Sequence, residues 1–353
     1  MNFHGGDIYS LEKTVLDFSS NINPLGVPES FRRVLAQRIN DFTRYPDIQY
    51  RELRAVLAGY LGFDRPDLLI PGNGAVEIIF KTIAALNCSR IVTFSPTFSE
   101  YARAARQQEK EVIDFFGYDE EFTRLNLDLL IEKVPTNSLV VICNPNNPTG
   151  TFLEPELISQ AAEKLRGKDS YLLLDEAFIE FTDQYPQNSM VKRLAGAPNL
   201  IVVRAATKFF GMPGIRLGFC VTSNEELAGR IKDLLEPWNV NTAAVLAGCT
   251  VYRDQDYIKA SRRWITEERN YLYQQLREIA ELTVYPSKAN YHLVRIDRAG
   301  IDAWRLKDLL IEKGILIRTP DGFNYLSSYH VRLAVKDRHA NNKLVKSLRE
   351  VLS

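Results

Sequence analysis

Short apolar runs alternate with amphipathic stretches along the middle of the chain. The apolar runs are bounded by polar or turn-forming residues, which predicts buried strands at RIVTF, KEVIDFF, SLVVIC, YLLLD, NLIVV and IRLGFCV. Helical spacing of apolar positions predicts helices around Ser99–Gln108 and Glu154–Leu165, and the turn PGNG opens a further helix. Strands that alternate with helices form a mostly parallel sheet covered on both faces. The pattern therefore predicts an α/β domain.

The pattern differs on either side of this alternation. Two helices are predicted before it, at Ser30–Phe42 and Tyr50–Leu61. After it, a long helix is predicted at Asp256–Leu282, and the short strands LTVYP, YHLVRI, ILIRT and YHVRLAV then alternate with helices at Asp302–Lys313 and Asp337–Leu352. This mixture predicts a small α+β domain at the C-terminus.

The first residues follow neither pattern. The stretch VLDFSSNINPLGVP is rich in Asn, Pro and Gly, which favour turns, so it is predicted to form a loop and an arm and not core. We therefore expect an N-terminal arm at 1–27, a large domain at 28–235 and a small C-terminal domain at 236–353. Part of 28–50 could also pack with the small domain.

Charge and cysteine content narrow the classes of function. Lys plus Arg and Asp plus Glu each number 44, so no long-range field favours a nucleic acid or an anionic membrane as partner. No apolar run approaches the roughly 20 residues of a membrane span, and a cytoplasmic location is expected. Cys88, Cys143, Cys220 and Cys249 form no CxxC pair, so buried thiols are expected in place of disulfides or a metal site.

Lys208 is the first candidate for chemistry. The apolar run Leu200–Val203 reads as a buried strand that delivers Lys208 to its carboxyl end. The following Gly and Pro residues force a turn that brings Arg216 back toward Lys208. Pyridoxal phosphate needs an amine for a Schiff base and a cation for its phosphate, and these two residues supply both. Taken alone, however, they could be ordinary surface charges.

Three further stretches place polar groups at ends of strands or helices. The glycine turn Gly72–Gly74 precedes a helix, where backbone N–H groups and the helix dipole favour an anion, although a turn alone also explains the glycines. Asn147, in NPNNPTG, follows the strand SLVVIC. Asp175 ends the apolar strand YLLLD, where an unpaired carboxylate is costly and a cation such as a pyridinium nitrogen would remove the cost.

Together these residues resemble the fold-type I, class I/II aminotransferase-like enzymes that use pyridoxal phosphate, and the resemblance spans essentially the whole chain. It implies a large domain with a mostly parallel central sheet and a small α+β C-terminal domain. It also implies that Lys208 forms the Schiff base, that Asp175 pairs with the pyridine nitrogen and that Asn147 binds the phenolic oxygen.

The same resemblance assigns the remaining cofactor contacts. It implies that Phe98, in SPTFSEY, stacks on the cofactor ring. Tyr50 would reach the phosphate of the neighbouring subunit's cofactor, which implies a homodimer with sites at its interface. The residues that would hold the phosphate within the subunit are Gly74, Ala75, Thr207 and Arg216.

Within this superfamily the chain is most similar to the threonine-phosphate decarboxylases of cobalamin biosynthesis, which release CO₂ from a phosphorylated amino acid. The opening HGGDIY followed by LDFSSNINPLG resembles theirs, and implies that His4, Gly5 and Asn21 contact the substrate. Arg318 in ILIRT and Arg332 in YHVRLAV match two substrate-binding arginines, whose fork geometry suits phosphate and carboxylate. Asn147 would also border the substrate.

Three positions depart from the pattern of the aminotransferases or decarboxylases. Phe178 stands where aminotransferases commonly have a tyrosine, and the decarboxylases share this Phe. Ala205 replaces a usual hydroxyl residue three positions before Lys208, so the phosphate site could lack one donor. Asp7 stands where HGGN is common, and an acidic group there could alter substrate preference.

The sequence leaves other functions open. A histidinol-phosphate-type aminotransferase is the main alternative, because motif spacing does not say which bond at the α-carbon breaks; HGG and Phe178 argue against it. A non-catalytic, cofactor-binding regulator would need an added DNA-binding domain, for which the chain has neither room nor charge. The choice between threonine phosphate and serine phosphate also stays open, because one methyl group is worth only about 1 to 3 kcal/mol.

Overall fold

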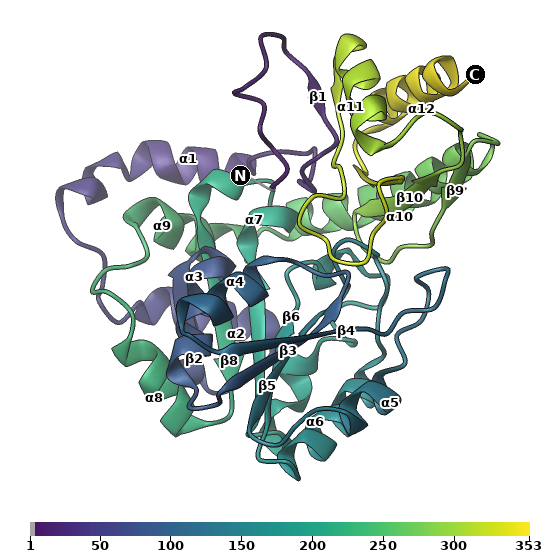
Figure 1. Cartoon of the computed structure of the whole chain (residues 1–353). Coiled ribbons are helices and arrows are strands. Elements are labelled where there is room, and N and C mark those ends of the chain that lie inside the picture. Colours follow the sequence, from purple (N-terminus) through teal and green to yellow (C-terminus); the bar gives the residue numbers. More distant parts are fainter. Residues whose placement is uncertain (1–3) are drawn as a thin grey trace.

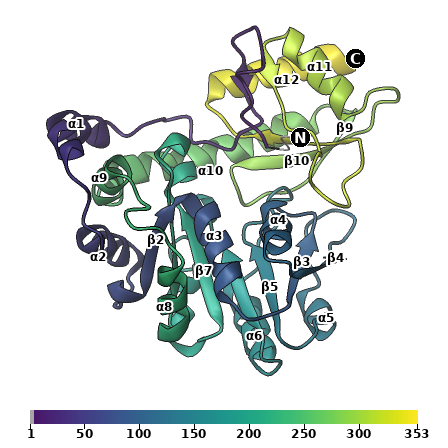
Figure 2. The same cartoon turned by 60° about the vertical axis from the view of Figure 1, so that its left-hand side comes forward.

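The structure, a computed structural model, describes residues 4–353. One large sheet with helices around it forms the lower part of the molecule in Figure 1, and the N-terminal arm and the C-terminal helices form the upper part. Figure 2 shows the same two parts from the side, with α1 (Glu29–Gln37) lying at the outer end of the large part beside α9 (Thr242–Val251).

The central sheet has seven strands in the order β2-β8-β7-β6-β5-β3-β4. Only β8 runs antiparallel to its neighbours, so the prediction of a mostly parallel sheet is confirmed. Six of the strands are fully buried along their length except for one terminal residue at most, because apolar runs without alternation suit a sheet covered on both faces. The strands are β2 (Leu69–Asn73), β3 (Arg90–Ser95), β4 (Glu111–Phe116), β5 (Ser138–Cys143), β6 (Tyr171–Asp175), β7 (Leu200–Ala205) and β8 (Leu217–Thr222).

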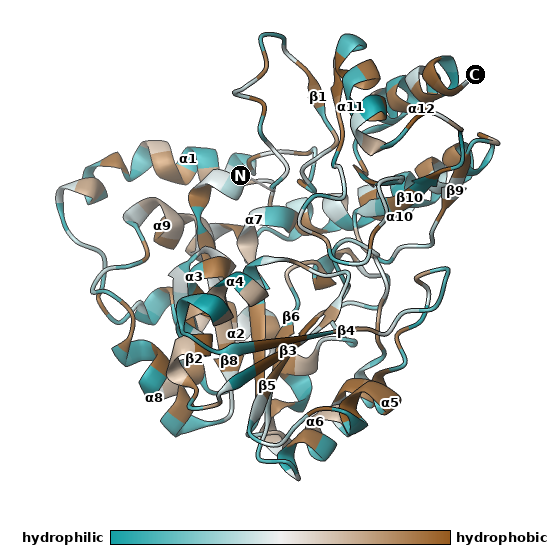
Figure 3. Cartoon of the chain, in the orientation of Figure 1, coloured by the Kyte–Doolittle hydropathy of each residue, from teal (hydrophilic) through white to brown (hydrophobic). Residues whose placement is uncertain are grey.

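The helices contain both apolar and polar residues, coloured brown and teal in Figure 3, and their buried apolar residues join the core around the sheet. The α-helices of this part are α2 (Arg51–Leu61), α3 (Gly74–Ala85), α4 (Glu100–Gln107), α5 (Leu127–Glu132), α6 (Pro155–Arg166), α7 (Ala206–Phe209) and α8 (Glu225–Asp233). Short 3₁₀ turns join them at η1 (Ile39–Thr43), η2 (Pro66–Leu68), η3 (Ile179–Phe181), η4 (Met190–Gly196) and η5 (Pro213–Ile215).

The C-terminal part contains a three-stranded antiparallel sheet in the order β12-β10-β9. Its strands are β9 (Leu282–Val284), β10 (Tyr291–Ile296) and β12 (His330–Ala334), and its helices are α10 (Gln255–Arg277), α11 (Ala303–Glu312) and α12 (Arg338–Leu352). This arrangement confirms the small α+β unit that the sequence predicts. The exact boundaries at residues 27 and 235 stay predictions, and α9, beyond the second boundary, packs against α2 and β8 of the large part.

The N-terminal arm differs from its prediction as loop. Its residues Leu16–Asp17 form β1, which pairs in parallel with β11 (Ile315–Leu316). Phe18, the next residue, is fully buried, and its carbonyl accepts a hydrogen bond from Ala334 N at 3.0 Å. The arm is therefore built into the C-terminal part, because the short apolar step LDF finds partners that are distant in sequence.

Two predicted helices are also shorter than expected. The helix expected at Ser30–Phe42 ends at Gln37 and continues as the 3₁₀ turn η1. The helix expected at Asp256–Leu282 ends at Arg277, because Leu282 already belongs to β9 and pairs with Ile296. Helix ends are set by such tertiary contacts more than by periodicity.

The described residues contain no helix long and apolar enough to cross a membrane. All four cysteines are buried and free. The cytoplasmic location stays a prediction.

Candidate active site

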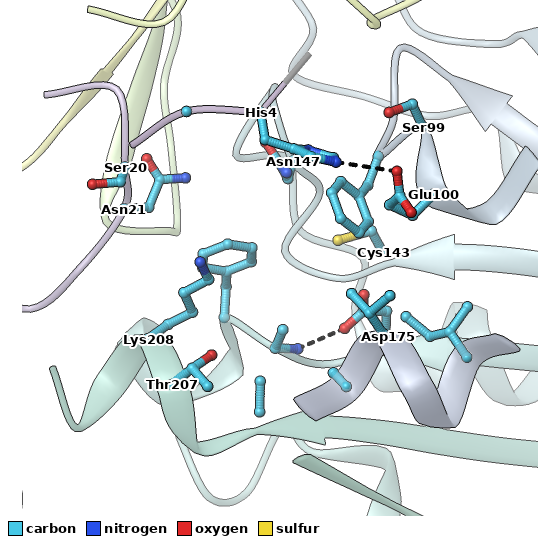
Figure 4. A pocket seen from close by; sticks show the side chains of 18 of the residues that line it. His4, Ser20, Asn21, Ser99, Glu100, Cys143, Asn147, Asp175, Thr207 and Lys208 are labelled. Carbon is cyan, nitrogen blue, oxygen red and sulfur yellow. Dashed lines mark hydrogen bonds and ion pairs between the residues drawn. The ribbon is translucent and has the colours of Figure 1, made fainter. Parts of the chain in front are cut away.

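One pocket of about 390 Å³ lies between the carboxyl ends of the central strands, the N-terminal arm and the small sheet. Figure 4 shows Lys208, Asp175 and Asn147 around one space, with His4 and Glu100 at its edge. The predicted site residues that line the pocket are His4, Gly5, Asn21, Ala75, Phe98, Asn147, Asp175, Thr207, Lys208, Arg216, Arg318 and Arg332. The fold thus gathers residues from almost the full length of the sequence.

The sheet register explains why these side chains meet. Asp175, the last residue of β6, pairs with Cys143 of β5 on one side and with Val203 of β7 on the other. Parallel strands end at the same edge of a sheet, so the residues that follow β5 and β7 arrive beside Asp175. Asn147 and Lys208 are delivered in this way.

Lys208 lies in the single turn of α7 that follows β7. The arm fixes the backbone there, because Asn23 N donates to the Lys208 carbonyl at 3.2 Å and Asn23 Nδ2 donates to the Phe209 carbonyl at 2.7 Å. Burial, with smaller contributions from the charges of Arg332 and Arg216, lowers the pKa of Lys208 to about 8. A larger fraction of this amine is therefore neutral at pH 7 than in a free lysine, and a neutral amine is the nucleophilic form.

Asp175 is a buried carboxylate with no cation within 4.0 Å among residues 4–353. Its Oδ1 accepts from Ala177 N at 2.9 Å and its Oδ2 accepts from the Tyr101 hydroxyl at 2.6 Å. Burial raises the pKa of Asp175, while both hydrogen bonds and the charge of Lys208 act in the opposite direction. The sequence analysis did not identify Tyr101, which lies three residues after Phe98 in the first turn of α4.

Gly74 does not line the pocket but shapes its edge. It begins α3 with φ +83°, and a Cβ built there would lie 2.5 Å from Nη2 of Arg216. The Arg216 guanidinium therefore lies directly against the amino end of α3, where backbone N–H groups and the helix dipole add to its positive field. Ala75 and Thr207 border the same end of the pocket, so this end suits a phosphate.

Tyr50 lies outside the pocket, and its placement differs from the prediction that it reaches out of its own subunit. The side chain is only 7% exposed. Its hydroxyl accepts from Val240 N at 3.0 Å and donates to Asn239 Oδ1 at 3.2 Å. Tyr45, in the same segment RYPDIQY, is instead 74% exposed and stacks on Trp238 with ring centroids 4.4 Å apart. Sequence alone could not tell which tyrosine would pack inward.

Two further arginines, Arg318 and Arg332, are buried and line the pocket. Arg332 donates to Asn147 Oδ1 and, at 2.6 Å, to the Ser19 carbonyl, and no described carboxylate lies within 4.0 Å of it. Burial and the charge of Arg318 lower the pKa of Arg332 to about 9. Burial likewise lowers the pKa of Arg318 to about 10. A bound anion would offset the cost of burying these two cations.

The N-terminal arm crosses the mouth of the pocket. His4 Nε2 lies 3.1 Å from Glu100 Oε1, and Glu100 also pairs with Arg103 at 2.8 Å. Gly5 passes so close to Ser19 that a Cβ would lie 2.2 Å from the Ser19 carbonyl oxygen. This close approach requires glycine and holds His4 at the rim. Sequence reasoning missed Glu100, which stands two residues after Phe98 in SPTFSEY.

The buried amide of Asn21 also lines the pocket, and its Oδ1 has no hydrogen-bond partner among the described residues. Phe178 and Ala205, two of the three positions that differ from the family pattern, border the pocket as well. Phe178 packs edge-on against Tyr291, with ring centroids 5.2 Å apart. Asp7 is exposed and is not part of the pocket wall.

These residues fit pyridoxal phosphate. A partly neutral lysine, a buried carboxylate that lacks a cation and a helix start lined by glycine and arginine match the aldehyde, the pyridine nitrogen and the phosphate of that cofactor. The fold and the pocket thus define a fold-type I enzyme that depends on pyridoxal phosphate. The model of the family "Aminotransferase class I and II" matches residues 13–348 of the chain. The chain therefore belongs to this family.

Several named proteins are similar over nearly the whole chain. A protein of Caldanaerobacter subterraneus subsp. tengcongensis, provisionally named a threonine-phosphate decarboxylase, is 38% identical over 98% of this chain and 93% of its own length. The threonine-phosphate decarboxylase of Salmonella typhimurium is 34% identical over 99% and 96%. The crystal structure of the histidinol-phosphate aminotransferase from Clostridium acetobutylicum superposes with a TM-score of 0.90 at 35% identity, covering 96% of this chain and 99% of that chain.

Proposed function

We propose that the chain catalyses the decarboxylation of an O-phospho-amino acid, either L-threonine O-3-phosphate or L-serine O-phosphate, and so produces CO₂ and an aminoalkyl phosphate for the cobamide nucleotide loop. The observation that carries this proposal is the second set of anion-binding groups. Arg318, Arg332 and His4 line the pocket in addition to Arg216 at the start of α3. A substrate with both a phosphate and a carboxylate would use them.

The cofactor would be held by residues on the large sheet. Lys208 would bond to it covalently, Asp175 would pair with its ring nitrogen, and Asn147 would donate to its phenolic oxygen. The residues proposed to hold its phosphate and ring are Gly74, Ala75, Thr207, Arg216 and Phe98. When bound, pyridoxal phosphate accepts electrons from a bond broken at the α-carbon of the substrate.

The chain's own residues would then decide which bond breaks. Arg332 and Arg318 orient the substrate carboxylate and phosphate, and the arm with His4 closes over the phosphate and excludes water. The orientation in which these residues hold the carboxylate and the α-hydrogen of the substrate would decide between loss of CO₂ and transamination. With a pKa of about 8, Lys208 Nζ can hold a proton near neutral pH and return it to the α-carbon after CO₂ has left.

A histidinol-phosphate-type aminotransferase is the second candidate, and the superposition on the Clostridium acetobutylicum enzyme favours it. That substrate also carries a phosphate, so Arg318 and His4 alone do not decide between the two reactions. Phe178 favours the decarboxylase, because the aminotransferases commonly carry a tyrosine that hydrogen-bonds the cofactor at this position. The two relatives named as threonine-phosphate decarboxylases, with 38% and 34% identity, also support the decarboxylase.

We further propose that the chain works as a homodimer. Five large apolar side chains are exposed near one another in the sequence segments around η1 and α9. Those on or just after η1 are Ile39, Phe42, Tyr45 and Ile48, and the one before α9 is Trp238. Tyr45 and Trp238 stack, and Ile48 lines one groove with Trp238, so these members of the patch are continuous. A patch of this kind suits burial against a second copy. Tyr45, and not Tyr50, is the tyrosine of this segment that a second copy can contact.

Replacing Trp238 with arginine should shift the protein from dimer toward monomer, because a charge would be buried within the patch. Sedimentation velocity at several concentrations measures this shift. The matched control is Trp304→Arg, since Trp304 is also 41% exposed but lies on α11. A wild-type monomer, or equal effects of the two substitutions, would contradict the proposed interface.

His4→Ala and Arg318→Ala should each lower kcat/KM for the phosphorylated amino acid by about 10- to 150-fold, because each removes a hydrogen bond to a charged group worth roughly 1.5 to 3 kcal/mol. Cofactor affinity should stay unchanged, since the cofactor phosphate is held at the start of α3. Unphosphorylated threonine should be a very poor substrate. The measurements are kcat/KM for CO₂ release and a separate cofactor titration.

The control for this experiment is Arg305→Ala, an arginine of α11 that does not line the pocket. This substitution should leave both kcat/KM for CO₂ release and the cofactor affinity unchanged. If His4→Ala and Arg318→Ala weaken cofactor binding as strongly as turnover, these residues belong to the cofactor site and the proposed substrate site is wrong.

A further inference from the structure

We propose that Tyr101 is a positioning residue that orients Asp175 and keeps it ionised for the ring nitrogen of the cofactor, an inference that rests on the role proposed above for Asp175. The hydroxyl of Tyr101 donates to Asp175 Oδ2 at 2.6 Å, and both side chains are buried. Tyr101 acts through Asp175, so it is not itself a catalytic residue.

The packing of α4 fixes the phenol. Tyr101 lies in the first turn of α4, its side chain is fully buried, and its ring meets Phe98 edge-on with centroids 5.5 Å apart. Phe98 in turn borders the pocket and lies 5.9 Å from the ring of His4. One helix start therefore sets both the aromatic wall of the pocket and the donor to Asp175.

Two donors define the orientation of the carboxylate. Ala177 N donates to Oδ1 at 2.9 Å while the Tyr101 hydroxyl donates to Oδ2, so neither oxygen is free to rotate. A carboxylate has about four lone-pair sites, and these two bonds leave acceptor capacity for a donor in the pocket. Without Tyr101, only the Ala177 bond at Oδ1 would hold the group in the described structure.

The same bond has an electrostatic effect. Burial raises the pKa of Asp175, and the Tyr101 hydrogen bond is the largest influence that lowers it. The other titratable groups whose charges interact with Asp175 are Lys208 on α7, Cys143 on β5 and Tyr291 on β10. Lys208 lowers the pKa of Asp175 further. Removing the phenol should therefore raise that pKa, so that Asp175 takes up a proton at a higher pH.

Cofactor binding to the apoprotein tests this inference separately from the overall reaction. The probe is pyridoxal phosphate itself, titrated between pH 5 and 9 into wild type and Tyr101→Phe. Loss of a hydrogen bond to a charged group predicts about 10- to 100-fold weaker binding at neutral pH. It also predicts that the loss of cofactor binding on the acidic side, the acidic limb of the binding curve, begins at a higher pH than in the wild type, because the protonated Asp175 cannot pair with a pyridinium.

Two further variants separate this role from a structural one. Tyr257→Phe removes a partly buried phenol that donates to the Gly26 carbonyl at 2.7 Å and should leave the acidic limb in place. A fluorotyrosine at position 101 has a more acidic hydroxyl of nearly the same size, so it should move the limb to lower pH. If neither Tyr101→Phe nor the fluorotyrosine moves the limb, the inference is wrong, whether or not the enzyme proves to be a decarboxylase.

Discussion

Lys208→Ala should abolish the covalent attachment of pyridoxal phosphate and lower turnover by on the order of a thousandfold or more, because no other group could take over both the covalent bond and the proton transfer at the α-carbon. Borohydride reduction followed by peptide mapping checks the attachment in the wild type, and steady-state rates check the turnover. The substitution should not unfold the protein. Since the pKa of Lys208 is lowered by burial, its charged form is disfavoured in the folded state at neutral pH, and alanine removes that cost.

The control for this prediction is Lys336→Ala. Lys336 lies near the pocket, where its Nζ donates to the Ser20 carbonyl at 3.2 Å and burial lowers its pKa. It should remain unlabelled by reduction, and its replacement should leave the covalent attachment intact. Labelling of Lys336 or of any lysine other than Lys208 would overturn the central assignment.

Asp175→Asn should retain cofactor binding but lower kcat by on the order of a hundredfold or more. Asparagine can keep the hydrogen bond from Ala177 N, yet its neutral amide cannot stabilise a protonated ring nitrogen in a buried site. The ring would then withdraw electrons less strongly from the α-carbon. The measurement is kcat at saturating cofactor, beside the cofactor dissociation constant of the variant.

Asp114→Asn is the matched control for Asp175→Asn. Asp114 accepts from Thr93 and Asn324, and it lies outside the pocket that contains Lys208. This variant should turn over at nearly the wild-type rate. Near-normal turnover of Asp175→Asn itself would remove Asp175 from the mechanism.

The strand-end residues could be predicted because each follows an uninterrupted apolar run. Asp175 ends one apolar run and Lys208 follows another within a single helical turn, and the carboxyl ends of parallel strands meet at one edge of the sheet. The central sheet and the small domain follow from the same periodicity. The sequence also located Asn147, since a proline-rich loop follows its strand.

Other features depend on contacts between distant segments and could not be predicted. The pairing of Leu16–Asp17 with Ile315–Leu316 joins the arm, which carries no periodic signal, to a predicted strand about 300 residues away in the sequence. Tyr45 and Tyr50 have similar local sequences, and only the position of Asn239 and Val240 directs Tyr50 inward. Tyr101 reads as an ordinary core residue, because its partner Asp175 is brought to it by the sheet alone.

The most direct test of the proposed function is the identity of the products. Purified protein with pyridoxal phosphate is incubated separately with L-threonine O-3-phosphate and with L-serine O-phosphate, while CO₂ and the aminoalkyl phosphate are quantified. We expect the two products in equal amounts from at least one of these substrates and little from unphosphorylated threonine. Transfer of the amino group from glutamate to imidazole-acetol phosphate without release of CO₂ would contradict the proposal and establish the aminotransferase in its place.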